Sequence, residues 1–572
     1  MKHPSQLLKQ LAFCTTFLCS FLSIHAQDIL WEKSYGGKQA DFLFDAVPTP
    51  DYGFILAGSS LSKKSGNKTE DNRGDLDYWV WKMDDKGNLD WQKSLGSTGQ
   101  DKLRCVLLTN DGGYLLAGSS ESKLLPKKGE SEKEFLDGDK KSFSRGQSDF
   151  WIIKLNAKGG EEWQKTIGGS GQDELTCAVR TKDGGFVIGG SSSSDVSGEK
   201  NKDSYGAMDY WVVKLDNEGK IIWQQSFGGE YNDELRSICL TKDGGFILGG
   251  SSNSSDTGNK TQKNLGENDY WVIKLDKNGN ELWQRTLGGK GDDQLNAVLT
   301  SSDGNYIIGG NSNSESSDDK KSTNESGTDF WVLKLDKEGK DILWQETYNI
   351  AKVDVLTSLV ENEDKTILLG GYAQGEVIKR KTPIKPAKIS KKSIASNIEE
   401  EPKMKNGTDD YVAIKINEKG EELWRRDVGC EGQDILKKVI ETRDGGYLMA
   451  GTSKTILNAD GNAKASGNKG SGKGGNDFWV VKLKDKQKPK EDKKPVEVIP
   501  NPATDYTNVI VGYDYTKGTA TLVDLAGHIL QQFEITEKTV PISLQGLPEG
   551  IYIVNIRTDV QNSGVKIIKS EK

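Results

Sequence analysis

Residues 223–282 decide the fold, and they read WQQSFGGEYNDELRSICLTKDGGFILGGSSNSSDTGNKTQKNLGENDYWVIKLDKNGNEL. Four short runs in this stretch are typical of β-strands, and they begin at Trp223, Asp233, Phe246 and Asp269. Asp-Gly-Gly separates the second run from the third, and glycine there tolerates the positive φ of a tight hairpin. No part of the stretch has helical periodicity. One unit therefore predicts four short antiparallel strands.

The unit is repeated along the chain, about every 60 to 80 residues. Its first tryptophan recurs at Trp31, Trp91, Trp163, Trp223, Trp283, Trp344 and Trp424. Four strands in each of seven units predict an all-β fold, a seven-bladed β-propeller. The array opens with an isolated tryptophan strand at 31–37, and its last unit stops after 477–483 without one. We expect these two ends to pair, which would close the propeller and remove its open edge.

The composition fits such an array. The 572 residues include 66 glycines and 14 tryptophans but only 13 prolines, and 34% are hydrophobic. Disordered chains are poor in large aromatic residues, so the low hydrophobicity indicates polar loops between strands. All 14 tryptophans lie inside the array, where we expect them to pack between neighbouring sheets. The alternative is that they form stacking platforms for sugars.

Charge and histidine content exclude several functions. The net charge is -8, from 77 basic and 85 acidic residues that are interspersed, so the concentrated basic face that nucleic acid requires is missing. The three histidines are His3, His25 and His528. Ser-His-Asp catalysis, Cys-His catalysis and His-ligated zinc are therefore excluded from most of the chain. We expect no catalytic residue, no metal site and no cofactor.

The N-terminal residues 1–26 are typical of a secretory signal peptide. Lys2 and Lys9 precede an apolar run that ends at Ile24, and Ala26 supplies a small residue for cleavage. The run is too short for a membrane span, so we expect a mature chain that begins at Gln27 and has no such span.

Four cysteines follow the signal peptide, at Cys105, Cys177, Cys239 and Cys430. They alternate with apolar residues, as buried thiols on strands would. A disulfide between neighbouring repeats is the alternative.

Three sets of charged residues recur in register. One aspartate opens the second run of every unit, at Asp41, Asp101, Asp173, Asp233, Asp293, Asp354 and Asp434. Another opens the fourth run, at Asp77, Asp149, Asp209, Asp269, Asp329, Asp410 and Asp477. Such rings could hold a cation such as calcium, but occurrence in every unit favours turn carboxylates that accept backbone N–H bonds.

A lysine recurs in the fourth run, at Lys82, Lys154, Lys214, Lys274, Lys334, Lys415 and Lys482. We expect these side chains to extend along the outer blade or to pair with a nearby carboxylate. An anion site is the weaker alternative.

The variable part of each unit lies between its third and fourth runs. These segments are 61–76, 121–148, 191–208, 251–268, 311–328, 372–409 and 453–476. They leave the unit at one position and so share one face, where insertions in repeat proteins commonly form the binding surface. Surface decoration without function is the alternative.

The sixth unit departs most from the pattern. Glu363-Asp364-Lys365 replaces Asp-Gly-Gly, Val412 replaces a tryptophan, and a basic insertion occupies 373–408. A site or a decayed repeat is therefore expected there first.

A charged linker, 485–497, separates the array from an alternating pattern that predicts a small β-sandwich at 498–572. Pro500-Asn501-Pro502-Ala503, the run at 522–527, the run at 544–552 and Lys566-Ile567-Ile568-Lys569 resemble the type IX secretion system (Por) C-terminal sorting domain, type A. The resemblance implies export through the outer membrane of a Bacteroidota-type bacterium and recognition by the secretion machinery. It also implies removal of this domain, with release of the protein or attachment at the cell surface.

These observations predict a signal peptide at 1–26, a propeller at 27–484, a linker at 485–497 and a sorting domain at 498–572. The leading hypothesis is a secreted or cell-surface propeller that binds a glycan or protein through its variable-loop face and is not an enzyme. Two alternatives are a secreted hydrolase or lyase acting on polysaccharide, and a purely structural surface component.

Overall fold

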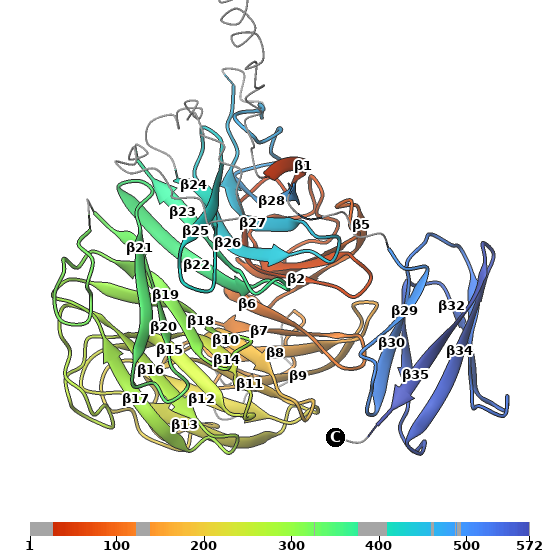
Figure 1. Cartoon of the computed structure of the whole chain (residues 1–572), viewed down its shortest axis with the longest axis horizontal. Helices are drawn as coiled ribbons and strands as arrows, with labels where there is room; N and C mark the ends of the chain where they lie inside the picture. The colour runs from red at the N-terminus through yellow and green to blue at the C-terminus, as the bar shows by residue number, and fades with distance from the viewer. Residues whose placement is uncertain are drawn as a thin grey trace, which may run out of the picture.

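A computed structural model describes residues 27–121, 138–324, 327–375, 409–458, 463–486, 488 and 493–570. All regular elements of this described part are β-strands (Figure 1). Within the same ranges, no helix has the length and apolar character needed to cross a bilayer. The expected signal peptide and most of the 373–408 insertion lie outside the described residues.

Seven antiparallel four-stranded sheets make up the repeat array. Sheet 1 contains β2 (Asp41–Pro48), β3 (Phe54–Ser60), β4 (Asp77–Met83) and β5 (Leu89–Leu95). Sheet 2 contains β6 (Asp101–Leu108), β7 (Tyr114–Ser120), β8 (Asp149–Leu155) and β9 (Glu161–Ile167). Sheet 3 contains β10 (Asp173–Arg180), β11 (Phe186–Ser192), β12 (Asp209–Leu215) and β13 (Ile221–Phe227). Sheet 4 contains β14 (Asp233–Leu240), β15 (Phe246–Ser252), β16 (Asp269–Leu275) and β17 (Glu281–Leu287).

The remaining sheets follow the same order. Sheet 5 contains β18 (Asp293–Thr300), β19 (Tyr306–Ser312), β20 (Asp329–Leu335) and β21 (Ile342–Tyr348). Sheet 6 contains β22 (Val353–Glu361), β23 (Ile367–Gln374), β24 (Asp409–Ile416) and β25 (Glu422–Val428). Sheet 7 contains β26 (Asp434–Glu441), β27 (Tyr447–Lys454), β28 (Asn476–Asp485) and β1 (Gln27–Tyr35). The tryptophan strand is thus the fourth of each sheet, and the variable segments join the second strand to the third.

The first and last strands of the array pair with each other. β1 runs antiparallel to β28, with Ser34 opposite Trp479 and Tyr35 opposite Phe478. The spare tryptophan strand at the start therefore fills the place left open in the last unit, as expected from the sequence.

The first strand of each sheet lies towards the middle of the array, and these seven strands are called the first strands below. They are β2, β6, β10, β14, β18, β22 and β26. Each contacts the next along the chain, and β26 also contacts β2. Figure 1 shows the first strands near the centre of the array, while fourth strands such as β13, β17 and β21 lie at its periphery.

Aromatic side chains pack between neighbouring sheets, as predicted for the tryptophans that follow Asp-(Tyr/Phe). The ring centroids of Tyr270 and Trp331 lie 4.9 Å apart, and the Tyr270 hydroxyl donates to the Trp331 backbone oxygen at 3.0 Å. Phe478 of sheet 7 contacts Trp79 of sheet 1 in the same way, at 4.7 Å. In sheet 6 the smaller Val412 takes this position.

The tryptophans of the fourth strands are mostly half-buried and pack against a turn of the next sheet. A Cβ atom at Gly279 would lie 2.9 Å from the Trp223 ring, and the φ of Gly279 is +83°. Glycine is required at this turn for both reasons.

A second group of strands follows the array and forms two sheets. They are β29 (Val496–Ile499), β30 (Tyr506–Val511), β31 (Gly518–Val523), β32 (Ile529–Ile535), β33 (Thr539–Ser543), β34 (Gly550–Thr558) and β35 (Asn562–Lys569). The sheet β29-β30-β33 and the sheet β32-β31-β34-β35 share one apolar core. Contacts with the array include ion pairs, such as Arg443 with Glu497 at 2.7 Å and Lys493 with Asp85 at 2.7 Å.

Candidate functional site

Both rings of aspartates are buried, and most of their members hold the turn before their strand. Asp233 Oδ2 accepts hydrogen bonds from the Gly229 backbone N–H at 2.7 Å and the Ser254 hydroxyl at 3.0 Å. Asp269 Oδ2 accepts from the Leu265 backbone N–H at 2.5 Å. Burial raises the pKa of Asp269 to about 6. These are the bonds expected of turn carboxylates.

A lysine from each described variable loop supplies the cation between the two rings, and the sequence reasoning missed it. These residues are Lys68, Lys140, Lys200, Lys260, Lys320 and Lys469, all buried. The Lys260 ammonium donates to the Ser254 backbone oxygen at 2.6 Å. Burial lowers the pKa of Lys260, and the charges of Asp233 and Asp269 oppose this shift. A recurring Gly-x-Lys, as in 258–260, was the available signal. No group of three potential metal ligands comes together in the part of the chain that the structure describes.

The lysines of the third strands are also buried, except for Lys214, which is partly exposed. Each ammonium pairs at 2.6–3.0 Å with the aspartate of the hairpin between the first and second strands. The predicted carboxylate pairing is therefore confirmed. Of the two expected arrangements the structure shows the pairing, which holds Lys274 at 3% exposure.

The sixth sheet keeps this pair in spite of its altered sequence. Asp364 binds Lys415 at 2.9 Å, and Lys365 adopts the positive φ, 64°, that a glycine has in most other hairpins. A cavity of about 260 Å³ lies beside it, lined in part by Glu363 and Arg443. Two of the lining side chains are held in ion pairs, Arg443 with Glu497 at 2.7 Å and Asp364 with Lys415 at 2.9 Å.

Cys105, Cys177, Cys239 and Cys430 are free thiols. Cys105 and Cys177 are buried on strands as expected, and Cys239 is partly buried on β14. Cys430 is buried but lies in the turn between β25 and β26, and a disulfide between repeats does not form.

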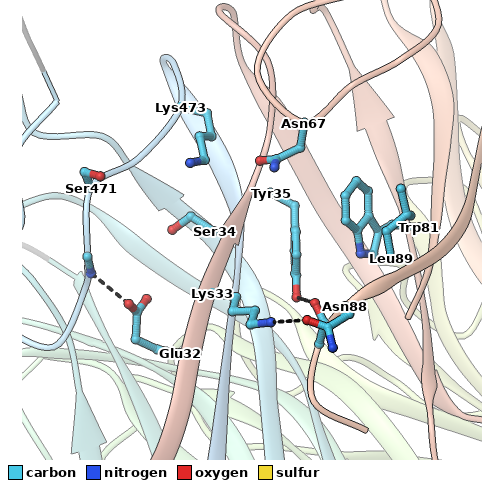
Figure 2. A pocket seen from close by; sticks show the side chains of 12 residues that line it. Glu32, Lys33, Ser34, Tyr35, Asn67, Trp81, Asn88, Leu89, Ser471 and Lys473 are labelled. Carbon is cyan, nitrogen blue, oxygen red and sulfur yellow. Dashed lines mark hydrogen bonds between the residues drawn. The ribbon is translucent and has the colours of Figure 1, made fainter. Parts of the chain in front are cut away.

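The larger cavity lies where β1 meets sheet 1 (Figure 2) and has a volume of about 540 Å³. One wall is β1 itself, and the facing walls come from β4 and the hairpin before β5. Two variable loops complete it, the first through Asn67 and the last through Gly470, Ser471 and Lys473. This cavity is called the β1 pocket below.

The walls of the β1 pocket are fixed by hydrogen bonds from β1. Glu32 stands where most units have glutamine, and its carboxylate accepts from the Gly470 backbone N–H at 3.0 Å and from Trp479 Nε1 at 2.9 Å. Lys33 Nζ donates to Asn88 Oδ1 at 3.1 Å, as Figure 2 shows. The Tyr35 hydroxyl donates to the Gly87 backbone oxygen at 2.7 Å.

Trp81 distinguishes this pocket from the equivalent positions of the other sheets. Those positions hold the aliphatic residues Ile153, Val213, Ile273, Leu333, Ile414 and Val481. The Trp81 ring packs 4.5 Å from the Tyr35 ring, measured between centroids. Burial raises the pKa of Tyr35 well above its usual value, so its hydroxyl remains a donor.

Three buried polar atoms at the β1 pocket have no hydrogen-bond partner among the described residues: Ser34 Oγ, Asn67 Oδ1 and Trp81 Nε1. An unpaired buried donor or acceptor costs about 1–3 kcal/mol. Two aromatic rings beside unpaired polar atoms suit a ligand that combines an apolar ring face with hydroxyl groups. The sequence offered one signal, the single tryptophan outside the two repeated positions.

Comparison with known proteins adds the identity of the C-terminal strands. Residues 497–570 match the family model of the secretion system C-terminal sorting domain. The sorting domain implies export by the type IX secretion system, contact with that machinery, and a location at the outer surface or outside the cell.

The array has more distant relatives. The regulatory protein FlaEY of Caulobacter vibrioides is 27% identical over 207 residues, which are 35% of this chain and 21% of that protein. This chain thus matches about a fifth of that relative's length.

Two solved structures are similar to this one. The Pan2 WD40 domain of Neurospora crassa is 10% identical, with 83% of this chain and 99% of that chain covered and a TM-score of 0.41. PorZ of Porphyromonas gingivalis, a surface component of the type IX secretion system, is 8% identical, with 92% and 81% covered and a TM-score of 0.23.

Proposed function

We propose that residues 27–484 form a closed seven-bladed β-propeller that binds a glycan or protein ligand after export, through the face that carries the variable loops, without catalysing a reaction. The sorting domain, joined by a linker at 485–497, is removed, and the propeller is released or attached at the cell surface. Pairing of β1 with β28 and the contact of β26 with β2 support closure.

The observation that carries the ligand-binding proposal is the β1 pocket. It joins the first and last variable loops, so a ligand bound there would touch the predicted binding face. Tyr35 and Trp81 line the pocket with aromatic rings that are 4% and 3% exposed, and Ser34 and Asn67 contribute buried polar atoms that have no partner among the described residues. Sugars present an apolar ring face surrounded by hydroxyl groups, so a glycan fits this lining best.

A glycan-array screen of the purified protein tests the proposal. We expect binding to a defined glycan, and we expect Trp81→Val, the residue found at two equivalent positions, to weaken it roughly tenfold or more. Trp283→Phe, at the edge of sheet 4, is the matched control and should leave affinity unchanged. No binding of the unaltered protein to glycan or protein arrays, or equal losses in the two variants, would contradict the proposal.

The same material distinguishes the enzymatic alternative. If the protein is a polysaccharide hydrolase or lyase, a glycan found on the array will be cleaved during incubation, and new chain ends will be measurable. We expect the bound glycan to remain intact.

A further inference from the structure

Each of the seven first strands contains one β-bulge at the same position. The register with the second strand shifts by one residue, three positions after the aspartate of the first ring. The bulge residues are Phe44, Arg104, Thr176, Arg236, Asn296, Thr357 and Lys437. A bulge re-aims its side chain and is frequent beside functional sites.

The neutral polar bulge residues bond to the backbone. Thr176 Oγ1 donates to the Leu235 oxygen at 2.6 Å, and Asn296 Nδ2 donates to the Leu356 oxygen at 3.0 Å. Thr357 bonds to the backbone of its own sheet. These three residues therefore hold neighbouring strands together. The cationic bulge residues, Arg104, Arg236 and Lys437, make no such bond to the backbone among the described contacts.

The three cationic bulge residues face one another across the ring of first strands. Arg104 Cζ lies 4.4 Å and Lys437 Nζ 5.9 Å from the centroid of the Phe44 ring. Arg236 is on β14, which adjoins neither β6 nor β26 in the ring. Its charge nevertheless acts on both Arg104 and Lys437. Arg104 and Lys437 therefore share one place beside Phe44, and Arg236 lies near enough for its charge to act on both.

Positive charge exceeds negative charge at this place. Glu234 pairs with Arg236, and Glu174 attracts Arg104. Lys437 makes no ion pair with any described residue, and Arg104 Nε is buried without a hydrogen-bond partner in the same set. Like charges held together in a partly buried site raise the free energy of the protein unless an anion joins them.

We propose that Arg104, Arg236 and Lys437 bind a small ligand carrying an oxyanion group, a carboxylate, phosphate or sulfate, at the centre of the ring of first strands. Two guanidinium groups offer paired donors that match the spacing of oxyanion oxygens, and the ammonium adds a compact charge. This site is separate from the β1 pocket and does not depend on it.

Calorimetric titration of the purified protein with inorganic phosphate, sulfate and glucuronate, at constant ionic strength, tests the site. We expect one saturable site for at least one probe, and the ranking of the three identifies the oxyanion. Arg104→Gln and Lys437→Met should each weaken binding roughly tenfold or more. Lys93→Gln, on the fourth strand β5, is the matched control, and Trp81→Val should also leave anion binding unchanged.

The pH dependence of the unaltered protein gives an independent test. Burial, with Arg104 from β6 and Arg236 from β14, lowers the pKa of Lys437 to about 8. The adjoining strand β2 presents Phe44, and its neighbour Asp45 pairs with Lys438 at 3.2 Å, while β22 presents the neutral Thr357. Affinity should therefore fall as the pH rises from 7 to 9, and Lys437→Met should remove this fall. Absence of saturable binding to all three probes, equal losses in Lys93→Gln, or a flat pH profile would overturn the proposal.

Discussion

Asp354 shows how strongly the surroundings of a single residue set its chemistry. It occupies the first aspartate ring, where burial raises the pKa of Asp41 and Asp434 to about 6. In sheet 6 burial and the charge of Asp329 raise the pKa of Asp354 to about 8. Backbone N–H groups of Ile350 and Ala351 are its hydrogen-bond donors.

This raised pKa makes the stability of the protein depend on pH. Folded protein keeps a proton on Asp354 that the unfolded chain releases between about pH 4 and pH 8. The contribution to the free energy of unfolding is therefore full below about pH 4 and is lost as the pH rises through 8. We expect Asp354→Asn to flatten the pH dependence between 5 and 8 by more than about 1.4 kcal/mol, the equivalent of one pKa unit.

Urea unfolding at pH 5 and pH 8 measures this change. Asp243→Asn is a suitable control, because hydrogen bonds and its lysine partner lower the pKa of Asp243 instead. A variant Asp354→Asn with the slope of the unaltered protein would contradict the assignment.

At the level of elements, the contact between most neighbouring sheets depends on a tryptophan of one third strand that packs against an aromatic ring of the next or preceding third strand. Trp271 is fully buried, and Tyr210 of the preceding sheet lies 4.9 Å from it between ring centroids. Trp223, on the fourth strand before it, is only half-buried. The two repeated tryptophan positions therefore differ in the stability that they provide.

We expect Trp271→Ala to lower the free energy of unfolding by about 3–5 kcal/mol, because the neighbouring sheets are too rigid to fill the cavity. Trp223→Ala should cost clearly less, since part of its ring is already in water. Chemical denaturation of both variants compares them, and equal losses would show that the buried position is not special.

The sequence predicted the sheets well because their signals are local. Alternation, Asp-Gly-Gly hairpins and evenly spaced tryptophans specify four strands per unit without knowledge of distant contacts. The bulge at Arg104 could not be predicted, because a bulge is a property of two paired strands and leaves no residue signature here. The β1 pocket could not be predicted either, because Ser34 and Asn67 come together only when the array is formed. Its one signal in the sequence is Trp81, the tryptophan outside the two repeated positions.

At the level of the whole molecule, two interfaces differ greatly in strength. β1 completes sheet 7 through a full antiparallel ladder and covers the edge of β28. The sorting domain touches the array through exposed or partly exposed ion pairs, such as Lys158 with Glu537 at 3.5 Å, and surface pairs contribute little.

Deleting residues 27–37 should therefore expose the edge of β28 and cause loss of stability and self-association. Deleting residues 493–570 serves as the control and should leave the melting temperature of the array nearly unchanged. Thermal melting and size-exclusion chromatography compare the two proteins. A monomeric, equally stable chain without β1 would contradict the role given to the β1–β28 ladder.

The position of β1 also sets an order of events during synthesis. The partner of β1 lies near residue 480, so β1 is synthesised well before the strand with which it pairs. The sorting domain follows that partner in the sequence. A chain that carries the C-terminal sorting domain has therefore already been synthesised through every strand from β1 to β28. Recognition of this domain consequently selects chains in which the whole array is present.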